Sequence, residues 1–360
     1  MRPWHDRPGA LERFISDLVA DELARLRPGA PLALPPRPWP AAVRLDEDGI
    51  GLDSLDRMGV APVLTEALHL HESGFGDWVE TAAESLRRFD AALTFRTSGS
   101  TGTPKPCRHV LAALQHEVEA LAGLSPLRGA VGRVLAAVPS HHICGFLFTH
   151  LLPARLGAVE TVDVRGLTAP ALRHQLHAGV LVIGHPAFWR LFAKHGLGTP
   201  LPHGVRGVSS TAPCPDALAQ GLVDQGLESL LQVYGSSETA GIGWRDCADA
   251  AFAPVVLQGH LDWLDEGHFT VGGRADAAVQ VGGVNVFLSQ VRRCLCDHLA
   301  VADADADRHA LCAELDAWVR TRLPAPARPR AIKFGAALPV DRRGKACDWS
   351  ITARVGAGSS

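Results

Sequence analysis

The hydrophobic positions in the first quarter of the chain recur at helical spacing. Residues 11–26 carry apolar side chains at positions 11, 14, 15, 18, 19 and 23, so that they share one face of an amphipathic helix. A second helical pattern follows residues 51–57 and runs to position 70, and a third, shorter one covers residues 77–89. We therefore expect a helical amino-terminal module over residues 1–92.

Further along the chain the pattern changes from helical to mixed. The short apolar run at residues 91–95 predicts a strand. Residues 134–154 are uncharged but contain two prolines and three histidines, which favours buried core and pocket wall over a membrane span. Helical patterns at residues 289–298 and 310–323, with a strand at residues 331–334, predict a small α+β unit over residues 274–360.

Composition narrows the class of protein. A chain of 360 residues that is 47% hydrophobic can build two or three cores. Its net charge is −3 and its Lys and Arg residues are scattered, so nothing suggests a nucleic-acid partner. Eight cysteines without a repeated Cys-x-x-Cys spacing fit free thiols in a reducing compartment, and no apolar run follows Met1. We expect a cytoplasmic protein.

Residues 97–105 read Thr-Ser-Gly-Ser-Thr-Gly-Thr-Pro-Lys and form the most informative segment. Glycines let backbone N–H groups approach anionic oxygens, hydroxyls add neutral donors, and Lys105 adds a positive charge. The spacing is not that of a Walker loop. A flexible Gly/Ser linker is the alternative, but the strand predicted directly before it argues for a loop held in place. The segment therefore predicts a polyphosphate site.

Four later segments carry complementary chemistry. Residues 233–239, Val-Tyr-Gly-Ser-Ser-Glu-Thr, offer a ring for stacking on a base, a hydroxyl for phosphate and a carboxylate for Mg²⁺. Residues 209–213 read Ser-Ser-Thr-Ala-Pro, residues 273–276 read Gly-Arg-Ala-Asp, and residues 339–345 end in Gly-Lys. In this order the segments resemble the motifs of the adenylate-forming superfamily, which comprises acyl- and aryl-coenzyme A ligases, nonribosomal-peptide adenylation domains and luciferases.

The resemblance implies a role for each matching residue. Lys345 is the expected catalytic lysine of adenylation, Glu238 with Thr101 is expected to hold Mg²⁺, and Asp276 is the expected hinge. By the same resemblance ATP is bound by Thr97, Ser98, Gly99, Ser100, Thr101, Gly102, Thr103, Lys105, Thr211, Ala212, Pro213, Tyr234, Gly235, Ser236, Ser237, Asp262 and Arg274.

A histidine doublet marks the expected acid-binding region. Residues 139–145 resemble the Pro-x-x-His-x-x-Gly element of aryl- and acyl-coenzyme A ligases, which places His142 beside the substrate carboxylate. Two hydrogen-bonded histidines in a loop are the alternative. Phe188 and Trp189 are further candidates for the acyl pocket. A metal site at the doublet is set aside because no third ligand lies at helical or short-loop spacing.

The chain also departs from the superfamily. Only 96 residues precede Thr97, fewer than in typical members, and the carboxyl-terminal part is short. His260 falls where a ribose-binding Asp is expected, so either Asp262 substitutes for it or nucleotide affinity is lower. The segment Asp53-Ser54-Leu55 between predicted helices resembles an acyl carrier protein, in which Ser54 takes phosphopantetheine; helix capping by Asp53 or Ser54 is the alternative.

These observations define one expected protein. Its fold is α/β, with a layered adenylate-forming core at residues 93–273 between the helical module and a small mobile lid at residues 274–360. With ATP and Mg²⁺ it activates a carboxylic acid, either an aryl acid such as a hydroxybenzoate or a medium-chain acid. The acyl group then passes to coenzyme A or to an acyl carrier protein. A catalytically degenerate module that binds nucleotide or a carrier protein is the alternative.

Overall fold

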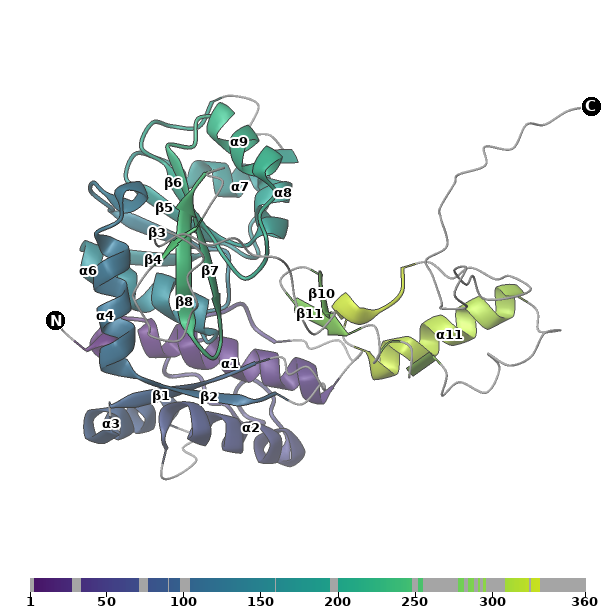
Figure 1. Ribbon diagram of the computed structural model, residues 1–360. Coiled ribbons are helices and arrows are strands. Elements are labelled where there is room, and N and C mark those ends of the chain that lie inside the picture. Colours follow the sequence, from purple (N-terminus) through teal and green to yellow (C-terminus); the bar gives the residue numbers. More distant parts are fainter. Residues whose placement is uncertain are drawn as a thin grey trace, which may run out of the picture.

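A seven-stranded sheet lies at the centre of the computed structural model (Figure 1). The structure describes residues 3–27, 34–70, 77–89, 91–97, 104–158, 160–194, 200–247, 252–254, 278–281, 284–287, 291, 294–295, 308–323 and 325–330. The strand order is β4-β3-β5-β6-β7-β8-β9; β3 to β7 run parallel, and β8 and β9 are antiparallel. These strands are β3 Arg133–Ala136, β4 Glu160–Asp163, β5 Val180–Gly184, β6 Arg206–Ser209, β7 Ser229–Ser236, β8 Ala240–Asp246 and β9 Ala253–Pro254.

Both faces of the sheet are covered, as a parallel sheet requires. In β5, all five residues are buried, and successive side chains enter different cores because they point to opposite faces. Val180 and Val182 pack with three helices on one face, and Leu181 and Ile183 pack with the amino-terminal helices on the other. The three helices are α7 Ala169–His174, α8 Pro186–Lys194 and α9 Asp216–Asp224.

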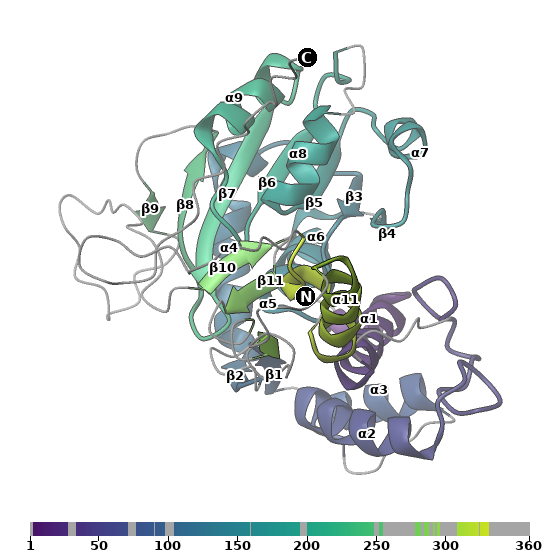
Figure 2. The same ribbon diagram turned by 90° about the vertical axis from the view of Figure 1, so that its right-hand side faces the viewer.

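The predicted amino-terminal helices are confirmed. They are α1 Ala10–Leu26, α2 Ser54–Leu68 and α3 Trp78–Phe89, and their hydrophobic core is continuous with that of the sheet. Figures 1 and 2 show α1 between the sheet and the pair formed by α2 and α3. The apolar stripe read from the sequence therefore packs into the core that these helices share with the sheet.

Short elements connect the amino-terminal helices to the sheet. The predicted strand is confirmed as β1 Ala92–Arg96, which pairs antiparallel with β2 Pro106–Val110. The uncharged stretch at residues 134–154 becomes β3, a loop and three consecutive helical turns, and its apolar side chains are buried. The remaining elements are η1 Trp4–Asp6, α4 Leu111–Ala122, η2 Ser125–Leu127, α5 Ile143–Phe146, the π-helix η3 Leu147–Leu151 and α6 Leu152–Leu156.

The carboxyl-terminal elements lie to one side of this body in Figure 1. The hairpin of β10 Ala278–Val281 and β11 Val284–Phe287 precedes α11 Arg308–Arg322, followed by η5 Ala325–Ala327. The helix predicted at residues 310–323 is thus confirmed, and its Val319 and Leu323 pack against Cys294. The helix predicted at residues 289–298 is described only at three positions, which are helical, and the strand predicted at 331–334 lies outside the described residues.

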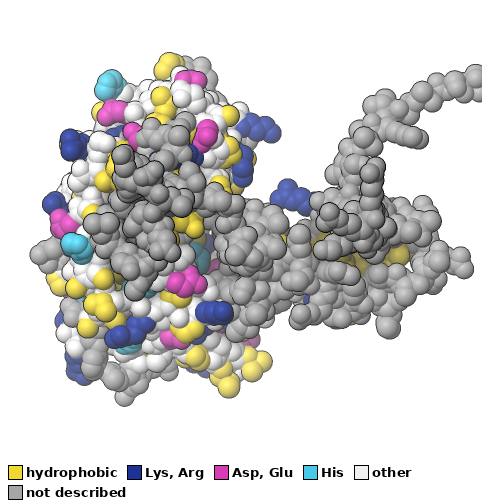
Figure 3. Space-filling view, viewed as in Figure 1, with side chains coloured by type: hydrophobic (Ala, Val, Ile, Leu, Met, Phe, Trp, Pro, Cys, Tyr) yellow, Lys and Arg dark blue, Asp and Glu magenta, His cyan; other side chains and the backbone are white. Residues whose placement is uncertain are grey.

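The outer surface carries mixed charge. On the face drawn in Figure 3, Lys and Arg side chains are interspersed with Asp and Glu over the described part of the molecule. Within that same part, no helix is both long enough and apolar enough to cross a bilayer.

Candidate active site

The sheet places four of the predicted segments at one edge. The carboxyl ends of parallel strands lead into residues 139–142 after β3, residues 185–189 after β5, residues 210–213 after β6 and residues 234–237 within and after β7. The chain leaves β3 toward β4 on one side and leaves β5 toward β6 on the other. Such a switch point is where open α/β sheets bind ligands. The topology therefore gathers these segments into one candidate site.

The β1–β2 hairpin presents the predicted phosphate loop. The Thr97 N–H donates to the Lys105 carbonyl oxygen at 2.9 Å, and the Lys105 N–H donates to the Thr97 hydroxyl oxygen at 3.3 Å. These two bonds close the hairpin on both sides of the hydroxyl-rich segment. Residues 98–103 themselves lie outside the described residues.

The turn between β7 and β8 carries the second predicted segment. The Ser236 hydroxyl oxygen accepts hydrogen bonds from the N–H groups of Glu238 and Thr239 at 3.2 and 3.3 Å, which fixes the turn. Gly235 is required beneath it, because a Cβ there would lie 2.0 Å from the Ala240 carbonyl oxygen. Tyr234 and Glu238 are exposed on this turn, where a ligand can reach them.

One hydrogen bond joins the two predicted nucleotide segments. The Nε2 of His109 on β2 lies 2.7 Å from the Ser237 carbonyl oxygen, so this ring nitrogen is the donor. Nearby, burial raises the pKa of Cys107, Glu238 raises it further, and Lys105 opposes both. Segments more than a hundred residues apart in sequence thus meet, with Lys105 and Glu238 both close enough to influence the Cys107 thiol.

The end of β6 completes this edge. The Ser210 hydroxyl donates to the Val233 carbonyl oxygen at 2.8 Å, and Thr211 adopts a left-handed backbone with φ 75° that turns the chain away from the strand. Burial raises the pKa of Cys144 to about 11, with a hydrogen bond to Ser210 opposing it. The β6 segment therefore contacts the region of the histidine doublet.

Helix α1 holds the histidine loop from the opposite side. Asp17 is 1% exposed, and its carboxylate accepts the Ser140 N–H at 2.7 Å and the Ser140 hydroxyl at 2.9 Å. Arg165 and Arg37 donate to its other oxygen at 2.5 and 3.1 Å. Burial raises the pKa of Asp17, but Arg165 leads the opposing contributions and the net shift is downward, so the carboxylate is ionised.

The two histidines differ in exposure: His141 is 5% exposed, whereas His142 is exposed to solvent. Desolvation by the surrounding protein, followed by the proximity of His141, lowers the pKa of His142 to about 4, so its ring is neutral at neutral pH. Asp21 approaches both rings from α1 and supplies the third neighbour that short-range spacing could not reveal.

A further buried carboxylate escaped the sequence reasoning. Glu117 on α4 is 3% exposed and accepts the Gly241 N–H at 2.9 Å, directly beside the β7–β8 turn. Desolvation raises its pKa to about 8, with the Gly241 N–H opposing the shift. The sequence did offer one signal for both Glu117 and Asp17: an acidic residue at a helical position that the apolar pattern predicts to be buried.

The two pocket aromatics occupy different environments. Trp189 is fully buried in the core, where its indole N–H donates to the Val208 carbonyl oxygen at 3.1 Å. It packs against the strands, since a Cβ at Gly207 would lie 2.8 Å from its ring. We therefore assign Trp189 a structural role, while the partly exposed Phe188 stays a prediction for the pocket.

The capping alternative accounts for the segment that begins α2. The Asp53 side chain accepts the Asp56 N–H at 2.8 Å and the Asp56 side chain accepts the Asp53 N–H at 3.2 Å, which is a capping box. Ser54 is exposed as the first residue of the helix, and its modification stays a prediction. The other predicted site residues, Asp262, Arg274, Asp276 and Lys345, lie outside the described residues.

Comparison with known proteins bears directly on this site. Residues 45–261 match the family described as "AMP-binding enzyme". A 4-coumarate–CoA ligase of Rhodobacter capsulatus is 39% identical over 94% of this chain and 100% of its own length. A 4-coumarate–CoA ligase of Cereibacter sphaeroides is 35% identical over 89% of each chain.

A solved structure supports the fold. The amide bond synthetase McbA from Marinactinospora thermotolerans superposes with a TM-score of 0.55 at 16% sequence identity, covering 94% of this chain and 93% of that chain. This chain therefore shares its fold with that structure.

Proposed function

The chain belongs to the AMP-binding enzyme family as an AMP-forming acid–coenzyme A ligase, and on that premise we propose that its acid is 4-coumarate or a close hydroxycinnamate. The His109–Ser237 hydrogen bond supports the nucleotide half of this function, because it joins the phosphate-loop hairpin to the Tyr234 turn. The acid itself is proposed from the relatives, and the family membership replaces the alternative of a binding module without catalysis.

The proposed reaction has two steps, adenylation of the acid and transfer of the acyl group to coenzyme A. A carboxylate oxygen of the acid attacks the α-phosphorus of ATP, the bond to the β-phosphate oxygen breaks, and acyl-AMP and pyrophosphate form. The coenzyme A thiol then loses its proton and attacks the acyl carbon, so that a thioester forms and AMP leaves. Catalysis of both steps depends mainly on positioning and on stabilising charge that develops at the reacting oxygens.

The residues divide this work. Lys105 and the hydroxyls of residues 98–103 bind the β- and γ-phosphates, and Tyr234 stacks on adenine beside the segment of residues 211–213. Ser237 approaches the α-phosphate. Arg274 contacts the nucleotide, Asp262 replaces the expected ribose-binding Asp, and Asp276 is the hinge. Lys345 bridges the acid carboxylate and the α-phosphate when the carboxyl-terminal lid closes.

Glu238 suits a Mg²⁺ ion that arrives with ATP, because it is an exposed carboxylate on a turn fixed by Ser236 and Mg²⁺ prefers oxygen ligands. Thr101, outside the described residues, would add a hydroxyl oxygen. When bound, the ion neutralises phosphate charge. Glu238 orients it, and Lys105 supplies the second positive charge on the phosphates.

The choice of acid replaces the hydroxybenzoate expected from the sequence. Two relatives above 30% identity that align over most of both chains are named 4-coumarate–CoA ligases. In this proposal the neutral imidazole of His142 lies near the carboxylate of the acid, and the partly exposed Phe188 contacts its ring. Coenzyme A is the acceptor in this proposal.

Acid-dependent ATP–pyrophosphate exchange tests the proposal. We expect exchange with 4-coumarate to exceed that with benzoate, hydroxybenzoate and octanoate, and thioester to appear only when coenzyme A is added. Lys345→Ala should lose on the order of 10²–10³ in exchange rate, and Lys345→Arg should recover only part. Exchange that is strongest with octanoate, or that survives Lys345→Ala, would refute the acid assignment or the lysine role respectively.

A further inference from the structure

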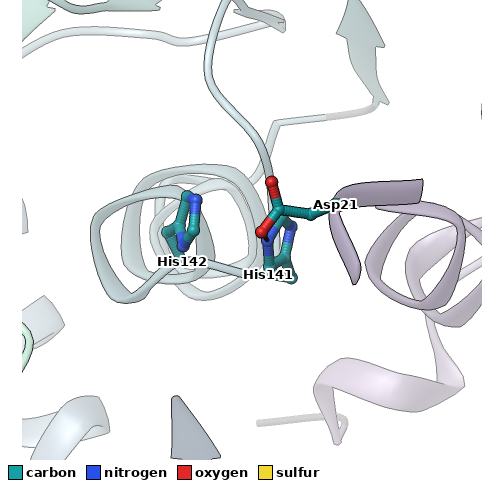
Figure 4. A group of neighbouring side chains, drawn as sticks. All are labelled: Asp21, His141 and His142. Atoms are coloured by element: carbon teal, nitrogen blue, oxygen red, sulfur yellow. Dashed lines mark ion pairs between the residues drawn. The ribbon is translucent and has the colours of Figure 1, made fainter. Parts of the chain in front are cut away.

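Three side chains from two distant segments converge beside the switch point of the sheet (Figure 4). Asp21 projects from α1 toward the loop after β3, where His141 and His142 are adjacent. One ligand atom from each residue lies within 4.8 Å of the other two, and the two ring centroids are 4.1 Å apart. Two imidazoles and one carboxylate form a donor set typical of transition-metal sites.

The histidine at the centre of this cluster is buried without a close hydrogen-bond partner. His141 is 5% exposed, and among the described residues the Asp21 carboxylate approaches its Nε2 only to 3.5 Å, while its Nδ1 makes no hydrogen bond. A buried imidazole without partners costs free energy, so a further ligand is expected at one nitrogen. This is an independent sign that the cluster receives something from solution.

The separation of the ligand atoms matches metal coordination better than an ion pair. The Nε2 of His141 lies 3.5 Å from Oδ2 of Asp21, which is long for a charge-assisted hydrogen bond. Two ligands at roughly 2.0–2.2 Å from a tetrahedral ion stand about 3.3–3.6 Å apart. An ion between these two atoms therefore needs only a small adjustment of an exposed side chain, since Asp21 is 63% exposed.

Charge around the cluster leaves one carboxylate for a cation. Asp17, one helical turn before Asp21, pairs with Arg165 and Arg37, and Arg165 is shared with Asp163, so these two carboxylates match the two arginines. Within the described chain, Asp21 makes no hydrogen bond to an arginine or a lysine. Asp17 instead fixes the loop through Ser140, directly before His141, and so restricts where the backbone of His141 can lie.

We propose that Asp21, His141 and His142 bind a divalent transition-metal ion of the Zn²⁺ class, with one coordination position open to water or another oxygen ligand. The ion joins α1 to the loop that follows β3. Because the proposed function places His142 beside the acid carboxylate, occupancy of this site should raise the KM for the acid; this consequence alone rests on the proposed function.

Cobalt(II) is the probe for the site, and Zn²⁺ the competitor. With tag-free protein we expect one Co²⁺ per chain and visible d–d absorption without the near-ultraviolet band of thiolate ligation, both abolished by added Zn²⁺. Asp21→Asn, at an exposed position, should weaken Co²⁺ binding at least about tenfold, the lower end of the effect of losing an outer-shell partner. His142→Gln should remove the spectrum.

A second histidine–carboxylate pair provides a matched control. His203 Nδ1 lies 3.5 Å from Glu228 Oε2, the same separation as in the cluster, but its side chain is 99% exposed and no third metal ligand joins it among the described residues. His203→Gln should leave the Co²⁺ spectrum and affinity unchanged. The proposal is overturned if wild type binds no stoichiometric Co²⁺, or if Asp21→Asn and His142→Gln bind it as His203→Gln does.

Kinetics separate the site from its consequence. If the spectra follow the expected pattern but Zn²⁺ leaves the KM for 4-coumarate unchanged, the metal site stands and the placement of His142 in the acid pocket is wrong. If Zn²⁺ raises that KM in wild type and not in Asp21→Asn, both assignments are supported.

Discussion

Two buried carboxylates position two sides of the site by the same contact but carry different charge. Asp17 on α1 accepts a backbone N–H from the histidine loop at 2.7 Å, and Glu117 on α4 accepts one from the start of β8 at 2.9 Å. Asp17 is also paired with two arginines, and its pKa falls below the ordinary range. Glu117 has no such cation among the described residues, and its pKa rises to about 8.

The difference shows that burial alone does not decide the charge of a positioning residue. Desolvation raises the pKa of both carboxyl groups, and the net shift depends on whether nearby arginines lower the pKa by more. On the α1 side, an ionic network holds the histidine loop. On the α4 side, a carboxyl group that is mostly protonated at neutral pH holds the start of β8. Removing charge should therefore affect the two regions in opposite ways.

Asp17→Asn should give the largest loss of stability. It removes the carboxylate partner of Arg37 and one of the two carboxylate partners of Arg165, the other being Asp163; breaking such a buried pair typically costs about 3–5 kcal/mol. Because the folded-state pKa is depressed, the contribution of Asp17 is present above its unfolded pKa of about 3.9 and is lost as pH falls through the lower folded value. Urea unfolding at neutral and acidic pH measures this. If Asp17→Asn lowers the free energy of unfolding by less than about 1 kcal/mol at neutral pH, the ionic network adds little and the contrast with Glu117 fails.

Glu117→Gln should raise the free energy of unfolding above that of the wild type at alkaline pH, whereas Asp17→Asn lowers it. Between about pH 4.3, where the unfolded carboxyl ionises, and about pH 8, the folded state binds more protons than the unfolded state, so wild-type stability falls as pH rises. The amide lacks this dependence and keeps the bond to Gly241. The variant should gain on the order of a few kcal/mol relative to wild type between acidic and alkaline pH, as measured by urea midpoints. A parallel pH dependence for both proteins would show that Glu117 is ionised.

The contrast between these two residues also marks how far the sequence could lead. Periodic spacing was sufficient for α1, α2, α3 and α11, because each buries one apolar face. Strand β1, which leads to Thr97, followed from an apolar run that ends in a hydroxyl-rich segment, whereas its pairing with β2 was not predicted. These elements depend on local pattern, and local pattern is what a sequence displays.

Long-range pairing was the missing part. Asp17 meets Ser140 and Arg165 only because α1 packs across the carboxyl end of β3, and Asp21 reaches the histidines for the same reason. Trp189 was expected in the acyl pocket, but its ring lies in the core, in the space left by the missing side chains of Gly184 and Gly207. No spacing rule reports such contacts, because they depend on which strands become neighbours.

Glu117→Leu separates the hydrogen bond from the charge. It leaves the buried Gly241 N–H without an acceptor, which should cost about 1–3 kcal/mol, whereas Glu117→Gln retains the acceptor. Because the β7–β8 turn lies beside this N–H, we also expect a higher KM for ATP in the leucine variant only. Steady-state kinetics of both variants check this. Equal KM values would mean that Glu117 supports the fold without positioning the turn.

Glu84→Gln is the limiting case, a paired carboxylate without burial. Glu84 pairs with Arg88 one turn later on α3, and both side chains are more than half exposed. Solvent screens the pair, so the change should lower the free energy of unfolding by no more than about 0.5 kcal/mol and leave ligase activity unchanged. Urea unfolding beside Asp17→Asn measures the ratio of the two effects. A loss near that of Asp17→Asn would show that pairing, and not the burial of the pair, sets the stability of the α1 side, because the same acid–arginine contact would then be worth as much in water as in the core.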